Sequence, residues 1–278
     1  MRDSLFEKSY AKINLFLKII DKRNDGFHNI RSGVTLINLY DEVIAEKNSS
    51  FSVEYFGKFA PINKKFDDCV VEKIFSNFNL KKPNYKFKIK KNIPVQSGLG
   101  SASSNIATVL RILQKLKLIT KNKKYNFATL GADVPIFINR QDCLVRGIGD
   151  KIISQLYPKY FFLLIKPEFN CSTKLMYSKI TNDHIDYKIN NDLNEINRFD
   201  VGNDFEKIIF KEHKDIINIF NFLKNIEGVI FSRVTGSGSC FYATFNNIDS
   251  AINAKKIFYK KYPNLWTFIA ENNLSYLK

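Results

Sequence analysis

A predicted strand, a loop rich in glycine and serine, and a predicted helix follow one another directly between residues 85 and 116. Residues 85–91 alternate between apolar and polar side chains, and apolar residues recur at helical spacing over 107–116. The loop at 93–105 joins them. The first turn of a helix offers unpaired N–H groups and a partial positive charge, and glycine lets an anion approach closely. This order predicts a phosphate-binding loop, with a flexible turn and a serine helix cap as the simpler alternative.

The loop does not follow the two most familiar nucleotide-binding patterns. Neither G-x-x-x-x-G-K-[ST] nor G-x-G-x-x-G occurs anywhere in the chain. Serine hydroxyls can nevertheless hydrogen-bond to phosphate oxygens, and one can hold a Mg²⁺ ion that bridges phosphates. A nucleotide therefore remains the expected ligand, bound by a different kind of loop.

Strand and helix patterns are mixed along the whole chain, which predicts the α+β class. Strands are expected at residues 9–20, 34–39, 42–46, 51–56, 85–91, 161–165, 229–234, 240–245 and 265–270. Helices are expected from Asp67 and Asp68 to about Phe78, and at 204–222 and 250–259. A polar surface loop is expected near 121–124. A weak boundary near 150–159 predicts two domains, 1–155 and 156–278.

The net charge is +16, from 43 basic and 27 acidic residues. Such a charge admits a basic RNA-binding protein without catalysis as one class. The lysines are dispersed, however, and the abundance of Lys, Asn, Ile, Phe and Tyr is typical of AT-rich genomes. Compositional bias is the preferred interpretation, so we expect no nucleic-acid partner, although a basic protein would still attract a nucleotide.

The 4 cysteines and 3 histidines are scattered and form no C-x-x-C pair, which argues against a structural zinc site. Reduced cysteines in a chain without a signal-like apolar stretch are typical of the cytoplasm. No segment approaches the ~20 apolar residues that a membrane span needs. We therefore expect a cytoplasmic protein, a monomer or homodimer, with no membrane partner.

Three motifs in a consistent order resemble the GHMP small-molecule kinases. Residues 94–104 (PVQSGLGSASS) resemble the family's P-x-x-x-G-L-G-S-S-S loop, which wraps the ATP phosphates. Residues 11–15 (AKINL) resemble the opening motif of one branch of the family, and residues 234–240 (VTGSGSC) resemble the third glycine motif of that branch. The resemblance covers about residues 10–243. It implies a two-lobed α+β fold with the active site in the cleft between the lobes.

The resemblance also implies the catalytic residues and the cofactors. Lys12 and Asp133 correspond to the family's catalytic pair. Asp133 would accept the proton of the attacking hydroxyl or hold it in line, and Lys12 would keep Asp133 ionised and steady the developing phosphate charge. Taken alone, they would be a solvated strand lysine and a helix-cap aspartate. ATP would be bound by Pro94, Val95, Gln96, Ser97, Gly98, Leu99, Gly100, Ser101, Ala102, Ser103 and Ser104. Mg²⁺ is expected with ATP, without an assigned protein ligand.

Residues 23–28 (RNDGFH), 130–137 (LGADVPIF) and 147–150 (GIGD) resemble one branch of this family. That branch acts on a cytidylylated sugar alcohol in the non-mevalonate isoprenoid pathway. Phe27 and Tyr177 would clamp the cytosine, since stacking on a base contributes ~1–3 kcal/mol. His28 follows a turn and is poorly placed for a core, so it would bind the base edge, while Asn14 would contact the sugar alcohol. The loop closing over the substrate, or alternatively a plain hairpin turn, would be Gly236, Ser237 and Gly238.

Some positions depart from the family's usual residues. Phe27 stands where Tyr is usual, which retains stacking but loses a hydroxyl. Ser101 and Ala102 replace a common Gly-Gly pair, Asp68 replaces an Asn near the adenine, and the segment 100–133 is short. Phe27 and Tyr177 could also be ordinary core aromatics. A GHMP kinase acting on mevalonate or homoserine is the alternative within the family.

Overall fold

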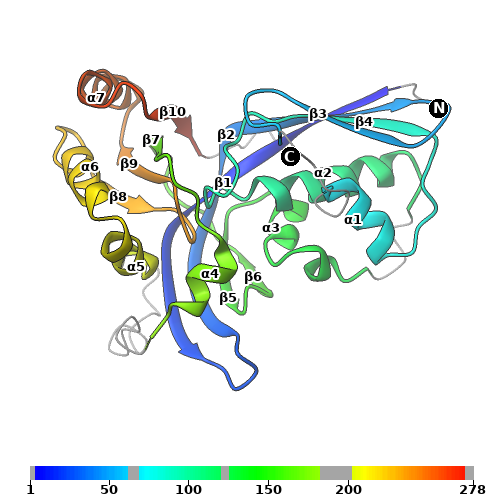
Figure 1. Cartoon of the computed structure of the whole chain (residues 1–278), viewed down its shortest axis with the longest axis horizontal. Helices are drawn as coiled ribbons and strands as arrows, with labels where there is room; N and C mark the ends of the chain where they lie inside the picture. Colours follow the sequence, from blue (N-terminus) through cyan, green and yellow to red (C-terminus); the bar gives the residue numbers. More distant parts are fainter. Residues whose placement is uncertain (1–3, 62–68, 120–124, 182–201, 273–278) are drawn as a thin grey trace. The chain divides into compact units, whose positions relative to one another are not determined.

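The computed structural model describes residues 4–61, 69–119, 125–181 and 202–272 (Figure 1). Packing divides the chain into two compact units, each made of several segments. Unit 1 comprises Met1–Ala11, Leu39–Val95 and Gly100–Arg140, and unit 2 comprises Lys12–Asn38, Gln96–Leu99 and Gln141–Lys278. This is a division by packing rather than along the chain, so the boundary near residues 150–159 stays a prediction.

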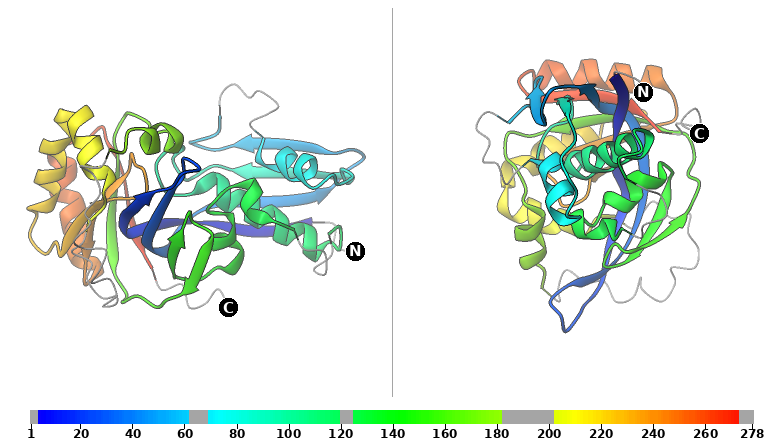
Figure 2. Two further views of the ribbon diagram at one scale, coloured as in Figure 1. Left: turned by 90° about the horizontal axis from the view of Figure 1, so that it is seen from below. Right: turned by 90° about the vertical axis from the view of Figure 1, so that its right-hand side faces the viewer.

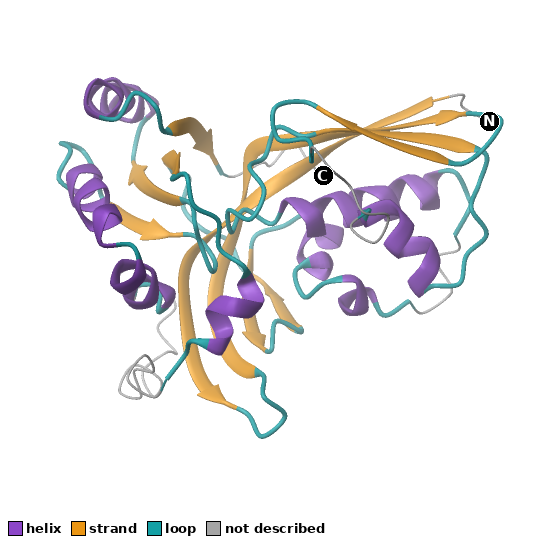
Figure 3. Ribbon diagram, in the orientation of Figure 1, coloured by secondary structure: helices purple, strands orange, loops and turns teal. Residues whose placement is uncertain are grey.

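Helices and strands are mixed in the chain, which confirms the α+β class (Figure 3). The strands are β1 (Ser4–Lys22), β2 (His28–Lys47), β3 (Ser52–Phe56), β4 (Tyr85–Lys90), β5 (Cys143–Gly147), β6 (Lys151–Ser154), β7 (Phe161–Lys166), β8 (Phe231–Val234), β9 (Phe241–Phe245) and β10 (Trp266–Glu271). The helices are α1 (Val70–Asn77), α2 (Ser101–Lys115), the 3-10 helix η2 (Phe127–Leu130), α3 (Val134–Asn139), α4 (Thr173–Ser178), α5 (Phe205–Glu212), α6 (Lys214–Lys224) and α7 (Ile248–Lys261).

Strands β1 and β2 each contribute residues to both units. The two strands expected at 34–39 and 42–46 are a single strand, β2, so that prediction was wrong. Asp41 interrupts the apolar pattern between them, but it is 0% exposed and its carboxylate accepts hydrogen bonds inside the protein. A charged residue that is satisfied in the interior does not end a strand.

Unit 1 packs its helices on one face of a short sheet (Figures 1 and 2). Strand β4 is antiparallel to β2 and parallel to β3. The Phe51 ring packs edge-on against Phe75 of α1, with centroids 5.2 Å apart, and lies 6.0 Å from the Phe87 ring of β4. Helix α2 begins at Ser101, earlier than the apolar spacing indicated. The predicted start of the first helix at Asp67, and the loop at 121–124, lie outside the described residues.

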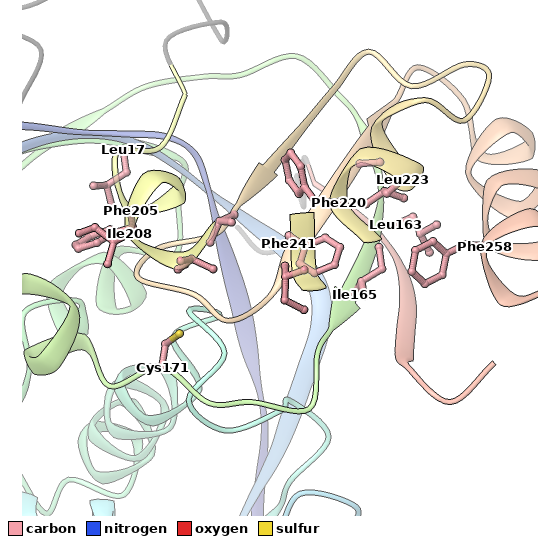
Figure 4. Packing of buried hydrophobic residues seen from close by; sticks show 14 of the residues in the cluster. Leu17, Leu163, Ile165, Cys171, Phe205, Ile208, Phe220, Leu223, Phe241 and Phe258 are labelled. Atoms are coloured by element: carbon pink, nitrogen blue, oxygen red, sulfur yellow. The ribbon is translucent and has the colours of Figure 1, made fainter. Parts of the chain in front are cut away.

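Unit 2 contains an antiparallel sheet in the order β10-β7-β9-β8. Alternate residues of its strands, such as Leu163, Ile165 and Phe241, pack against side chains from α5, α6 and α7 to form one core (Figure 4). Leu17 and Ile19 of β1 belong to the same core. In the part of β2 that belongs to unit 2, the strand pairs with β5, and β5 pairs with β6.

The single helix expected at 204–222 is two helices, α5 and α6. His213 separates them with φ −123° and ψ 74°, outside the helical region. Its ring stacks on Phe169 at a centroid distance of 3.7 Å. The apolar periodicity continues across His213, so the pattern alone does not reveal the break.

The four cysteines Cys69, Cys143, Cys171 and Cys240 are all buried and none is in a disulfide. Burial raises the pKa of the Cys171 thiol to about 11, which keeps it protonated near neutral pH. Within the described residues, no helix is both long enough and apolar enough to cross a membrane.

Candidate active site

Lys12 and Asn14 lie on one face of β1, as their two-residue spacing predicts. Lys12 Nζ donates to Asn14 Oδ1 at 2.6 Å, and Asn14 Nδ2 donates to Ser32 Oγ at 2.8 Å. Lys12 is 4% exposed and Asn14 5% exposed. Lys12 is therefore not a solvated strand lysine. Its ammonium is held in a fixed place by an amide oxygen, in unit 2.

The loop that begins at Thr235 is joined to this pair. The Asn14 N–H donates to Thr235 Oγ1 at 3.1 Å. Gly236 has a φ of +55°, and a Cβ placed there would lie 3.3 Å from both Lys12 Nζ and Asn14 Oδ1. A side chain at this position would be strained and would crowd the ammonium. The third glycine motif thus places no side chain of its own against the Lys12 ammonium at Gly236.

Asn203 supports the same loop, and the sequence did not identify it. Its Nδ2 donates to the carbonyl oxygens of Val234 at 2.7 Å and Gly236 at 2.8 Å, and the residue is 4% exposed. An Asn in Gly202-Asn203-Asp204 before a helix resembles an ordinary capping turn. The capping turn was the sequence signal that could have drawn attention to Asn203. Its bond to the Gly236 carbonyl, 33 residues away, has no such signal.

The middle of the glycine-serine loop belongs to unit 2 and contacts this cluster through backbone atoms. The Lys12 N–H donates to the Leu99 carbonyl at 3.0 Å, and the Cys240 N–H to the Ser97 carbonyl at 3.1 Å. Gly98 has a φ of +76°, and a Cβ there would collide with the Thr235 carbonyl. The first and third motifs and residues 96–99 are therefore brought together.

The side chains of the loop differ in what they can offer a ligand. Pro94 and Leu99 are buried, so any contact they make with a nucleotide would use backbone atoms. Val95 and Gln96 are exposed. Gln96 also has a φ of 50°, which is uncommon for a residue with a side chain.

The predicted serines at the start of α2, in unit 1, differ in how their hydroxyls are used. Ser104 Oγ donates to the Tyr10 carbonyl at 2.6 Å, and Ser101 Oγ donates to Asp41 Oδ2 at 2.9 Å, so both hydroxyls serve the interior. Ala102 is exposed and Ser103 is half-buried. Among these serines, Ser103 is the best placed to offer its hydroxyl to a phosphate.

Asp133 is the residue before α3, also in unit 1, and is half-buried. It occupies the cap position, but its side chain makes no capping hydrogen bond to α3. The Val134 N–H instead bonds to the Gly131 carbonyl at 3.0 Å. A Cβ on Gly131 would lie 3.3 Å from Ser103 Oγ, so the turn leading to Asp133 adjoins the start of α2.

His28 is 7% exposed, so the expectation that it avoids the interior was wrong. Its Nε2 has no hydrogen-bond partner among the described residues. The Tyr177 ring lies 5.6 Å from the His28 ring at 34°, and Tyr177 also packs edge-on against Phe205 at 5.0 Å. Burial, and then the charge of Lys22, lower the pKa of His28 below 6.5, which keeps the imidazole neutral near pH 7.

Phe27 and Ser237 complete the predicted substrate residues. Phe27 is 59% exposed, so it is no core aromatic. Ser237 Oγ lies 3.0 Å from Thr173 Oγ1 at the start of α4, the helix that carries Tyr177. Gly238 follows with a φ of +86°. In unit 2 the structure places His28 beside Tyr177, and Ser237 beside α4.

Among the described residues, no group of three or more His, Cys, Asp or Glu side chains could hold a metal ion. Mg²⁺ does not need such a group, because it often binds through phosphate oxygens, water and one or two protein oxygens. The glycines with positive φ and the start of α2, where Ala102 is exposed and Ser103 half-buried, fit a bound nucleotide phosphate.

Comparison with known proteins matches both halves of the chain to domains of the GHMP kinases. The profile of the GHMP kinases N terminal domain matches residues 66–140, and that of the GHMP kinases C terminal matches 183–264. The 4-diphosphocytidyl-2-C-methyl-D-erythritol kinase of Francisella tularensis subsp. novicida is 34% identical over 242 residues, covering 84% of this chain and 85% of that protein. The enzyme of the same name from Wigglesworthia glossinidia brevipalpis is 33% identical, covering 97% of this chain and 90% of that protein.

Solved structures share the fold. A crystal structure of 4-(cytidine 5′-diphospho)-2C-methyl-D-erythritol kinase has a TM-score of 0.78 at 22% identity, covering 97% of this chain and 100% of that chain. A mevalonate kinase reaches 0.60 at 18% identity, covering 96% of this chain and 99% of its own. The chain therefore belongs to the GHMP kinases and, within them, to the family of its relatives, the 4-diphosphocytidyl-2-C-methyl-D-erythritol kinases.

Proposed function

We propose that this kinase transfers the γ-phosphoryl group of ATP to the 2-hydroxyl of 4-diphosphocytidyl-2-C-methyl-D-erythritol, a step of the non-mevalonate isoprenoid pathway. The relatives named for this substrate support the assignment at 33–34% identity over most of the chain. The observation that carries it is the cluster of Lys12, Asn14 and Gly236, which joins the first and third motifs at one ammonium group.

In the proposed reaction, Asp133 accepts the proton of the attacking hydroxyl. The hydroxyl oxygen bonds to the γ-phosphorus, the bond from that phosphorus to the bridging oxygen breaks, and ADP leaves. Lys12 stabilises the negative charge that develops on the transferred group, which is the main task of a protein in phosphoryl transfer. Asn14 keeps the Lys12 ammonium in place, and its amide also faces the sugar alcohol.

ATP would be held by the backbone of residues 94–100 and the first turn of α2, with the Ser103 hydroxyl as a side-chain ligand. Mg²⁺, when bound, neutralises charge on the phosphate oxygens. Ser103 is the residue of this chain that we assign to that ion, because the hydroxyls of Ser101 and Ser104 already bond to interior groups.

The cytosine ring would lie near Phe27, His28 and Tyr177. An exposed phenylalanine and a half-buried tyrosine offer the ring faces that a base needs for stacking. The Nε2 of neutral His28, which bonds to none of the residues that the structure describes, would hydrogen-bond to the base edge. Mevalonate and homoserine have no ring, so they would leave this nitrogen unpaired, which costs binding free energy.

The test is ADP release by the purified protein with Mg-ATP and each of three acceptors. We expect release with 4-diphosphocytidyl-2-C-methyl-D-erythritol and none with mevalonate or homoserine. The matched variant is His28→Ala, for which we expect a higher KM for the cytidylylated substrate and an unchanged KM for ATP. Release with mevalonate or homoserine alone would reject the proposed substrate while keeping the kinase family.

A further inference from the structure

Asp41 is a fully buried carboxylate in the middle of β2, at 0% exposure. Its Oδ1 accepts hydrogen bonds from the backbone N–H groups of Asn92 at 2.7 Å and Ile93 at 2.8 Å. Its Oδ2 accepts hydrogen bonds from three side chains that flank the loop: Lys91, Ser101 (2.9 Å) and Asn105 (3.0 Å).

The two oxygens of Asp41 thus hold opposite ends of the same loop. Asn92 and Ile93 immediately precede residues 94–100, and Ser101 and Asn105 follow them on α2. All of these groups lie in unit 1. The Asp41 carboxylate therefore fixes the residues on both sides of the loop relative to each other through hydrogen bonds.

The loop needs such a closure because its own conformation is unfavourable. Gln96, Gly98 and Gly100 have φ values of 50°, 76° and 75°. Glycine loses the most conformational freedom when it is ordered, and a left-handed Gln is disfavoured by its Cβ. Without fixed ends, ordering these residues around a nucleotide would oppose binding.

Lys91 is the buried partner that balances the charge of Asp41. It is 4% exposed, forms an ion pair with Asp41, and donates to Asn105 Oδ1 at 2.7 Å. Burial lowers the pKa of Lys91, and the charge of Asp41 opposes that shift. Apolar residues of similar volume often stabilise a core equally well, so stability alone does not require this pair.

We propose that Asp41 is a positioning residue for ATP, which preorganises the phosphate-binding loop by fixing both of its ends with one carboxylate. The inference rests on the proposed function, because it takes residues 94–104 as the ATP-binding loop. It adds a residue outside every motif, more than 50 positions before the loop.

The test is Asp41→Asn, measured by calorimetric titration with Mg-ATP and by steady-state kinetics, well below the melting temperature. The amide keeps the shape of the side chain but cannot accept hydrogen bonds at both ends. We expect the Kd and the KM for ATP to rise about tenfold, the effect of losing hydrogen bonds to a charged group. The KM for the cytidylylated substrate should not change.

The control is Glu7→Gln, a second buried carboxylate in unit 1. Glu7 accepts from Arg111 Nε at 3.0 Å and pairs with Lys115 at 2.8 Å, both on α2, but neither residue lies in the loop. We expect this variant to lose stability and keep the wild-type Kd for ATP. If Glu7→Gln weakened ATP binding as much as Asp41→Asn does, the weakening would follow from lost stability and not from the position of the loop. That result would overturn the proposal.

If Asp41→Asn does not fold, Asn105→Ala removes one donor on the α2 side while the ion pair remains. We expect this variant to raise the Kd for ATP by a smaller factor. A folded variant at either position with wild-type ATP affinity would overturn the proposal. Wild-type protein that binds ATP but does not turn over the cytidylylated substrate would instead reject the proposed substrate, and the ATP titrations would still test Asp41.

Discussion

Lys12 is the residue on which the proposed chemistry depends most. Its ammonium is buried, hydrogen-bonded to Asn14, and next to a glycine that leaves space beside it. We expect Lys12→Met to lower kcat by about 10²–10³, the cost of removing one preorganised electrostatic group. Steady-state kinetics with saturating ATP and cytidylylated substrate would measure this. Lys88→Met, which removes a surface partner of Glu46, serves as the control, and equal kcat values in both variants would contradict the role of Lys12.

The buried His28 leads us to expect that the stability of the protein depends on pH. Burial and Lys22 lower its pKa in the folded protein below the ordinary value of 6.5. Below pH 6.5 the unfolded chain therefore binds more protons at this residue, and stability falls as the pH falls through 6.5. We expect His28→Gln to show a smaller drop in melting temperature than the wild type between pH 7.5 and pH 5.5. Parallel curves for the two proteins would contradict this account.

At the scale of elements, strands β2 and β5 place Arg31 directly opposite Arg146. Arg31 is 8% exposed, and burial first, then Arg146, lowers its pKa. Like charges in opposite positions destabilise a sheet, and opposite charges contribute roughly 0.2–1 kcal/mol. We expect Arg146→Glu to raise the melting temperature and Arg146→Gln to raise it less. A melting temperature below wild type for both variants would contradict the repulsion.

The start of α2 predicts different effects for two neighbouring serines. Ser104 Oγ donates to the Tyr10 carbonyl and accepts from Ser9 Oγ, so Ser104→Ala should cost about 1–3 kcal/mol of stability by leaving buried groups unpaired. Ser103→Ala should leave stability unchanged and raise the KM for ATP. Thermal unfolding and initial rates would separate the two. A larger stability loss at Ser103 than at Ser104 would contradict the assignment.

At the scale of the whole molecule, the sequence predicted features whose signal is local. The glycine loop, the strand carrying Lys12 and Asn14, and most strands and helices of the C-terminal half depend on neighbouring residues. Their patterns are visible in windows of about ten residues. The family followed from motifs of this kind, and the comparisons confirm it. The individual roles of Lys12 and Asp133 stay predictions.

Features that depend on distant partners could not be read from the pattern. Asp41 interrupts the apolar pattern, so it was expected in a break between strands. The donors that allow its burial follow it by 50 to 64 positions and leave no local signal. Asn203 resembled a helix cap, because its acceptors are more than 30 positions away. His213 was placed inside a helix, because its ring partner Phe169 lies on a different segment. Each is a pairing that only the folded chain specifies.

The sharing of β1 and β2 between the two units has a consequence for synthesis on the ribosome. Unit 1 has all of its segments once residue 140 has emerged. Leu17 and Ile19 of β1, however, complete their core with side chains as late as Phe258. At about 5–20 residues per second, these early apolar side chains wait roughly 10 to 50 seconds for the last of their partners. An apolar stretch near the start of the nascent chain therefore lacks part of its core until translation is almost finished.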